Sequence, residues 1–126
     1  MTVLDASAVL ALLWDEPGAA NVRDHLDGAW LGAANFSEVI GRIVDKGGDF
    51  VDVSQRLDSA GVDIVPLTAA DAELAGALRA IPAGRRLSLG DRCCLALAIR
   101  SSSGIVLTAD RAWTKLELPI DIRLVR

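Results

Sequence analysis

Two aspartates stand where apolar strands are expected to end. Asp5 follows Val3-Leu4, and Asp110 follows the apolar run 105–107 after two intervening residues. Near-continuous apolar strands are typical of parallel sheets that are covered on both faces. Ligands of such sheets bind beyond the carboxyl ends of the strands. We therefore expect Asp5 and Asp110 to lie at the edge of the sheet where a ligand would bind.

Two further acids occupy the expected first turns of helices. Glu38 lies three residues after Asn35, and Asp91 lies three residues after Ser88. Helices of an α/β fold begin near strand ends, so these carboxylates can reach the same edge as the two aspartates. The same spacing also describes a capping box, and Thr68-x-x-Asp71 repeats it. Taken alone, Glu38 and Asp91 are explained by caps and Asp110 by a turn. Asp5, at the end of an apolar strand, is harder to explain in this way, and the joint position of the four acids indicates a site.

Four carboxylates at one edge require a compensating charge. Two of them about 4 Å apart repel by roughly 4 kcal/mol at an effective dielectric constant near 20. Four together would take up protons or open the fold unless a cation neutralised them. An all-oxygen set suits Mg²⁺ or Mn²⁺, and the single His25 with the adjacent pair Cys93-Cys94 makes no Zn²⁺ site. Because bound Mg²⁺ activates water toward phosphate esters, the acids predict a metal-dependent phosphodiesterase.

The composition predicts one ordered domain, residues 1–126. The chain has 126 residues, of which 52% are hydrophobic, and a net charge of −4. This charge disfavours a general electrostatic grip on nucleic acid, so any such contact depends on local basic residues. The amino terminus lacks a basic signal-peptide region, and no apolar stretch approaches the ~20 residues of a membrane span. We expect a cytoplasmic protein with no membrane partner.

Strands and helices are expected to alternate along the chain. The apolar patterns, caps and Gly or Pro breaks predict strands at 3–4, 29–32, 62–66, 105–107 and 120–125, and helices at 8–14, 17–26, 35–46, 50–60, 68–78 and 88–100. This alternation predicts an α/β fold with three α/β/α layers around a central, mostly parallel sheet of four to five strands. The last strand is expected at an edge of the sheet.

The acid-bearing segments resemble, in order and spacing, those of the PIN-domain ribonucleases, and most of all the VapC-type toxins of type II toxin–antitoxin pairs. The matching segments are Val3–Ser7, Asn35–Val39, Leu87–Arg92 and Leu107–Trp113, with further likeness at Glu16–Ala19 and in the tail Arg123–Arg126. The likeness covers essentially the whole chain and shows no departure at the acids.

The resemblance implies a PIN-like fold and an endoribonuclease that cuts structured RNA, such as transfer or ribosomal RNA, with metal-activated water. It also implies a cognate antitoxin and a homodimer. The catalytic and metal-binding acids would be Asp5, Asp91, Glu38 and Asp110, the first two holding Mg²⁺ (or Mn²⁺) most directly. The hydroxyls of Ser7 and Thr108 would orient these carboxylates; a helix cap and a turn hydroxyl are the alternatives.

An acidic site needs flanking cations to hold RNA. The candidates beside the acids or in the preceding loop are Arg92, Arg111, Arg85 and Arg86. Each is equally explained as a solvated surface arginine. The tryptophans offer rings for base stacking, but packing in the core or at an interface accounts for them better; they are Trp14, Trp30 and Trp113.

Three other functions compete with the nuclease hypothesis. A phosphate-receiver domain would need paired acids after the first strand, whereas Asp5 stands alone. A phosphatase of the Asp-x-Asp type would need an acid at Ser7. A PIN-like module that binds RNA or protein with little catalysis stays open, because an intact acid set does not demonstrate turnover.

Overall fold

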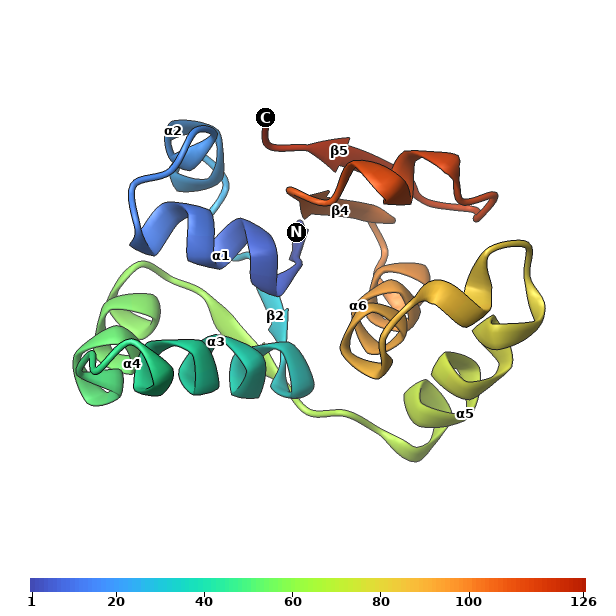
Figure 1. Cartoon of the computed structure of the whole chain (residues 1–126), viewed down its shortest axis with the longest axis horizontal. Coiled ribbons are helices and arrows are strands. Elements are labelled where there is room, and N and C mark those ends of the chain that lie inside the picture. Colours follow the sequence, from blue (N-terminus) through green and yellow to red (C-terminus); the bar gives the residue numbers. More distant parts are fainter.

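A computed structural model describes all 126 residues and contains a five-stranded parallel sheet of order β3-β2-β1-β4-β5 (Figure 1). The strands are β1 Val3–Leu4, β2 Trp30–Gly32, β3 Asp63–Val65, β4 Ile105–Thr108 and β5 Asp121–Leu124. The helices are α1 Ala6–Leu13, α2 Ala19–Arg23, α3 Ala33–Asp45, α4 Phe50–Ser59, α5 Ala69–Ala77 and α6 Leu89–Arg100. Short 3₁₀ turns cover Leu78–Ala80 (η1), Gly84–Arg86 (η2) and Arg111–Lys115 (η3).

The sheet is the middle of three layers. Successive residues of a strand point to opposite faces, and β1 divides accordingly: Leu4 packs in the larger core with α1 to α4, whereas Val3 packs in the second core with α6. Leu107 and Val106 of β4 divide in the same way. Figure 1 shows α1 to α4 on the left of the view and α5 and α6 on the right. The predicted three-layer α/β/α fold and the parallel sheet are confirmed.

Every predicted strand is present, and β5 lies at an edge as expected. Three helix starts were predicted wrongly. α1 begins at Ala6 with Asp5 at the cap position, two residues before the expected start at residue 8. α3 begins at Ala33 with Gly32 as its cap, so Asn35 lies inside the helix and Glu38 lies beyond the first turn. The helix expected at 17–26 starts only after Gly18, whose left-handed φ of 97° is not helical, and α2 ends at Arg23. None of the helices is long and apolar enough to span a bilayer.

The two helices of the right-hand layer are joined by an ion pair. Asp71 completes the predicted capping box with Thr68 at the start of α5. Its carboxylate also accepts hydrogen bonds from Arg100 at the end of α6, with distances of 2.7 Å and 2.9 Å. Asp71 is only 3% exposed. This pair therefore fixes α5 against α6, the helix whose other end carries Asp91.

The substitution Asp71→Asn should lower the free energy of unfolding by about 1–3 kcal/mol, because a buried charged partner of Arg100 is lost. Urea denaturation measures the change. The matched control is Asp52→Asn, which breaks an exposed pair with Arg56 on α4 and should cost less than about 0.5 kcal/mol. Equal losses in the two variants would contradict this role for Asp71.

Candidate functional site

All four predicted acids line one cavity of about 410 Å³. Asp5 and Asp110 follow β1 and β4, which are parallel neighbours paired through Val3–Val106 and Leu4–Leu107, so both carboxylates leave the same edge of the sheet. Glu38 comes from α3, and Asp91 from the first turn of α6. The cavity therefore gathers carboxylates from four segments that are far apart in the sequence.

Two hydroxyls hold Asp5. Ser7 Oγ accepts the backbone N–H of Ala109 at 2.9 Å, and Thr108 Oγ1 accepts that of Asp110 at 3.0 Å. Each hydroxyl is thus free to donate its own hydrogen, and both donate to Asp5 Oδ2, at 2.6 Å and 2.8 Å. Asp5 Oδ1 has no protein donor. Ser7 lies inside α1 and does not cap it, whereas Thr108 combines the turn role with the contact to Asp5.

The Asp5 carboxylate is electrostatically strained. Burial, opposed by the bonds from Ser7 and Thr108 and reinforced by the charges of Asp91 and Glu38, raises the pKa of Asp5 from 3.8 to about 6. Asp5 is 5% exposed, so water does little to screen this repulsion. A cation in the cavity would relieve it, and no basic side chain forms an ion pair with Asp5.

Asp91 and Asp110 serve local structure and line the cavity at the same time. Asp91 Oδ2 accepts the backbone N–H of Ser88 at 3.0 Å, which completes the capping box of α6. Asp110 Oδ1 accepts the backbone N–H of Ala112 at 3.0 Å and caps η3. In each carboxylate one oxygen accepts the hydrogen bond of the cap, and the other accepts no hydrogen bond from the protein. The capping explanation and the site explanation are therefore compatible.

Glu38 is positioned by contacts that the sequence pattern did not indicate. The buried amide of Asn35 donates to Glu38 Oε1 at 2.8 Å and to the carbonyl of Gly90 at 3.0 Å. A Cβ at Gly90 would lie 2.2 Å from Glu38 Oε1. Asn35 and Gly90 therefore let the Glu38 carboxylate rest against the start of α6, beside Asp91.

Two charged residues that line the cavity were missed: Arg42 and Asp45. They follow Glu38 by four and seven residues, and the helical period places such positions on one face of α3. That spacing was the available signal.

The structure buries one of the arginines that were predicted to contact RNA. Arg92 is 9% exposed, and its guanidinium donates to the carbonyl of Ala75 in α5 at 2.9 Å. Successive helical residues differ by about 100° around the axis, so Arg92 points into α5 while its neighbour Asp91 faces the cavity. Trp113 is fully buried in the core, as expected from packing.

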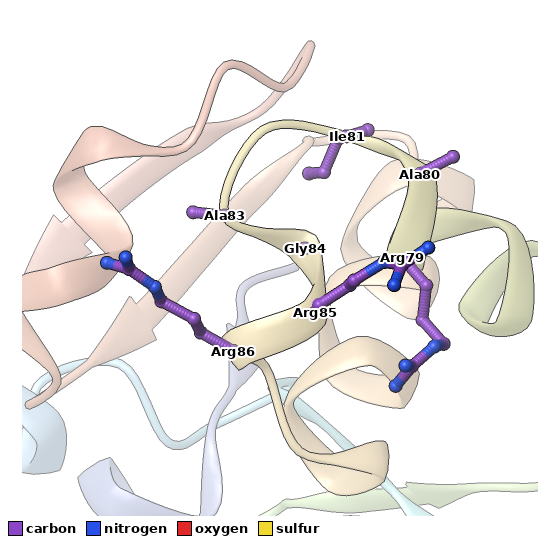
Figure 2. Close-up of a pocket in the computed structure, with 7 residues that line it drawn as sticks. All are labelled: Arg79, Ala80, Ile81, Ala83, Gly84, Arg85 and Arg86. Atoms are coloured by element: carbon purple, nitrogen blue, oxygen red, sulfur yellow. The ribbon is translucent and has the colours of Figure 1, made fainter.

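The other predicted arginines are exposed, and Arg85 and Arg86 line the largest cavity, of about 650 Å³ (Figure 2). A third arginine, Arg79, also lines this cavity, and the sequence pattern did not indicate it. Figure 2 shows the side chains of Arg79 and Arg85 on one side of the loop, with Arg86 extending to the other. None of the three forms an ion pair. Arg111 lies beside Asp110 on η3.

The donor set fits a hard divalent cation. The cavity offers carboxylate and hydroxyl oxygens and no His or Cys, which suits Mg²⁺ or Mn²⁺. No three acidic, His or Cys side chains are arranged closely enough to hold an ion directly. Mg²⁺ commonly keeps several waters and binds through one or two carboxylates, so a loose set of acids such as this one still matches its coordination chemistry.

Comparison with known proteins gives a consistent family. The model of the PIN domain matches residues 2–118. No curated protein sequence matches the chain. A toxin–antitoxin complex from Klebsiella pneumoniae contains a chain of 16% identity with a TM-score of 0.75, covering 100% of this chain and 98% of that one. A chain of VapBC2 from Rickettsia felis, bound to a DNA fragment from its promoter, is 13% identical with a TM-score of 0.69. That match covers 98% of this chain and 97% of the other. At these identities the structural likeness is one of fold.

The raised pKa of Asp5 predicts how the metal-free protein responds to pH. Between 3.8 and about 6 the folded state keeps a proton that the unfolded state has released, so the free energy of unfolding falls as pH rises. In chelator, wild type should lose on the order of 3 kcal/mol more than Asp5→Asn between about pH 4 and pH 7. Urea denaturation across this range tests it, with Asp24→Asn, an exposed acid outside the cavity, as control. Parallel curves for wild type and Asp5→Asn would refute it.

Proposed function

Because the chain belongs to the PIN domain family, we propose that it is a metal-dependent endoribonuclease that acts as the toxin of a toxin–antitoxin pair. The observation that carries this proposal is the meeting of four carboxylates at one cavity, with Asp5 buried and its pKa raised. Because these carboxylates repel one another and Asp5 is buried, the arrangement is unfavourable unless a cation binds among them.

Mg²⁺, or Mn²⁺ in its place, would polarise the scissile phosphate and lower the pKa of a water. In this proposal Asp5 and Asp91 would hold the ion with the oxygens that their local hydrogen bonds leave free. Ser7 and Thr108 keep Asp5 in its orientation. Glu38, whose Oε2 receives no bond from Asn35, orients the attacking water together with Asp110 and takes up its proton. Attack in line with the leaving 3′ oxygen gives a 5′ phosphate.

The proposed substrate is structured RNA, with transfer or ribosomal RNA suggested by the family resemblance. The acidic cavity repels a polyanion, so the backbone must be held elsewhere. The exposed arginines of the loop before α6, Arg79, Arg85 and Arg86, have no acidic partners and surround a cavity large enough for a phosphate. With Arg111 they are our candidates for contacts to the RNA backbone.

The proposed protein partners are a cognate antitoxin and a second copy of the chain. Of the two solved structures of similar fold, one is a toxin–antitoxin complex and the other is VapBC2 bound to promoter DNA. Exposed apolar side chains on and beside α3 and α4 offer a surface for such contacts: Val44, Phe50 and Val51 are each about half exposed. A PIN-like binding module with little catalysis is the alternative, and turnover with Mg²⁺ separates the two.

Cleavage of structured RNA by purified protein should require Mg²⁺ and Asp91. Wild type should release 5′-phosphorylated fragments with Mg²⁺ and none with chelator, whereas Asp91→Asn should lose at least about a hundredfold in rate, a typical loss for a group that stabilises charge in the transition state. Asn keeps an acceptor for the cap, so melting temperatures in chelator should not fall. Asp24→Asn is the control. RNA binding without cleavage by wild type would favour the binding module. Equal cleavage rates for Asp91→Asn and Asp24→Asn would overturn the assignment of Asp91 to the catalytic site.

The double variant Arg79→Ala/Arg85→Ala should weaken RNA binding without altering the acidic cavity. If each arginine contacts one phosphate, the slope of log affinity against log salt should fall by about one to two. Fluorescence anisotropy with labelled transfer RNA at several salt concentrations measures this. The control Arg23→Ala/Arg56→Ala removes the same charge from α2 and α4. An identical slope in both double variants would remove the loop from the RNA-binding surface.

A further inference from the structure

A single cation lines the acidic cavity. Besides the four predicted acids and Asp45, the only charged side chain of its wall is Arg42, on α3 one turn after Glu38. Arg42 is exposed and forms no ion pair with any of these acids. The guanidinium thus lines a cavity with five carboxylates without pairing with any of them, and it makes a different contact.

That contact is the ring of Trp14. The Arg42 guanidinium carbon lies 5.5 Å from the centre of this ring, which follows the last turn of α1. A guanidinium stacked on an aromatic face is attracted by the ring quadrupole, and its N–H donors remain available for hydrogen bonds to another group. Trp14 is half-buried against the larger core, so the ring is a fixed platform. The pair therefore holds a planar set of donors at the cavity.

The neighbouring wall is open to a ligand. Gly41 also lines the cavity, and no atom lies within 4 Å of the position that a Cβ would take there. Planar guanidinium donors match the geometry of phosphate oxygens, with which arginine forms paired hydrogen bonds. A polyanion entering a wall of carboxylates needs such a contact near the acids.

We propose that Arg42, seated on Trp14, is a phosphate-binding subsite that places an RNA phosphodiester next to the scissile one. This inference rests on the proposed ribonuclease function. Arg42 acts here as a binding and positioning residue, and its contact is to a phosphate that does not react. Two other roles predict different measurements: neutralising the acids, which would change the requirement for Mg²⁺, and joining α1 to α3, which would change only stability.

Lys46 provides a matched control. Lys46 lies one turn after Arg42, at the end of α3, and carries the same charge. Its Nζ is 5.9 Å from the centre of the Trp14 ring. It does not line the cavity. Arg42→Ala and Lys46→Ala therefore remove equal charge, and each removes a cation that lies over the Trp14 ring. The two positions differ in access to the cavity.

Steady-state cleavage of transfer RNA with saturating Mg²⁺ tests the proposal. Arg42→Ala should raise KM roughly tenfold or more, as expected for the loss of a charge-assisted hydrogen bond, with kcat changed much less. Lys46→Ala should stay within about twofold of wild type, the scale of an exposed charge. Arg42→Lys should recover part of the loss, since it restores the charge without the planar fork. The KM of Trp14→Leu should lie between those of wild type and Arg42→Ala.

The inference is overturned by equal KM values for Arg42→Ala and Lys46→Ala. It is also overturned if Arg42→Ala shifts only the Mg²⁺ concentration for half-maximal rate, or only the melting temperature. The same alanine variants in an Asp91→Asn background, measured by anisotropy with labelled transfer RNA, test the subsite independently of turnover. If wild type cuts no RNA while Arg42→Ala still weakens binding more than Lys46→Ala, the nuclease proposal fails and the subsite stands.

Discussion

The buried carboxylate of Asp5 is the constraint on which the site depends. Placing an acid at the end of a central strand removes it from water, and the nearby charges of Asp91 and Glu38 oppose its ionisation further. The hydroxyls of Ser7 and Thr108 only partly offset this cost. They do so because the backbone N–H groups that follow β4 occupy the acceptor side of each hydroxyl and direct its hydrogen to Asp5. The parallel pairing of β1 with β4 is thus what makes the carboxylate tolerable.

The remaining acids reach the cavity through elements that their own side chains help to build. Asp91 lies in the first turn of α6 and Asp110 caps η3, and each uses one oxygen for the cap. Glu38 depends on its neighbours: Asn35 ties it to α6, and Gly90 leaves the space it occupies. An acid that caps a helix is held in one orientation, so its second oxygen is presented at a defined position. Local stability and the geometry of the cavity are obtained from the same residues.

Charge is segregated on this molecule. The net charge is −4, and five carboxylates line one cavity, whereas three arginines without acidic partners surround another. Attraction of RNA therefore cannot come from the whole molecule and must come from local positive surface. Arg42 is the exception within the acidic cavity, and its contact with Trp14 explains how a cation stays beside the acids without pairing with them. Under the proposed function, binding by basic residues and hydrolysis at acidic ones would be separate tasks.

The sequence by itself determined the layers, the five strands and the four acids, because strand alternation, capping patterns and Asp residues after apolar runs are local signals. It did not determine where α3 begins: the Asn35-x-x-Glu38 pattern resembled a cap, whereas Asn35 is used in a contact with Gly90, 55 residues away. It also assigned Arg92 to the surface, although that side chain faces α5. Only the tertiary structure decided these points, and the places of Arg42 and Arg79, because which face of a helix or loop meets a cavity depends on packing between segments distant in the sequence.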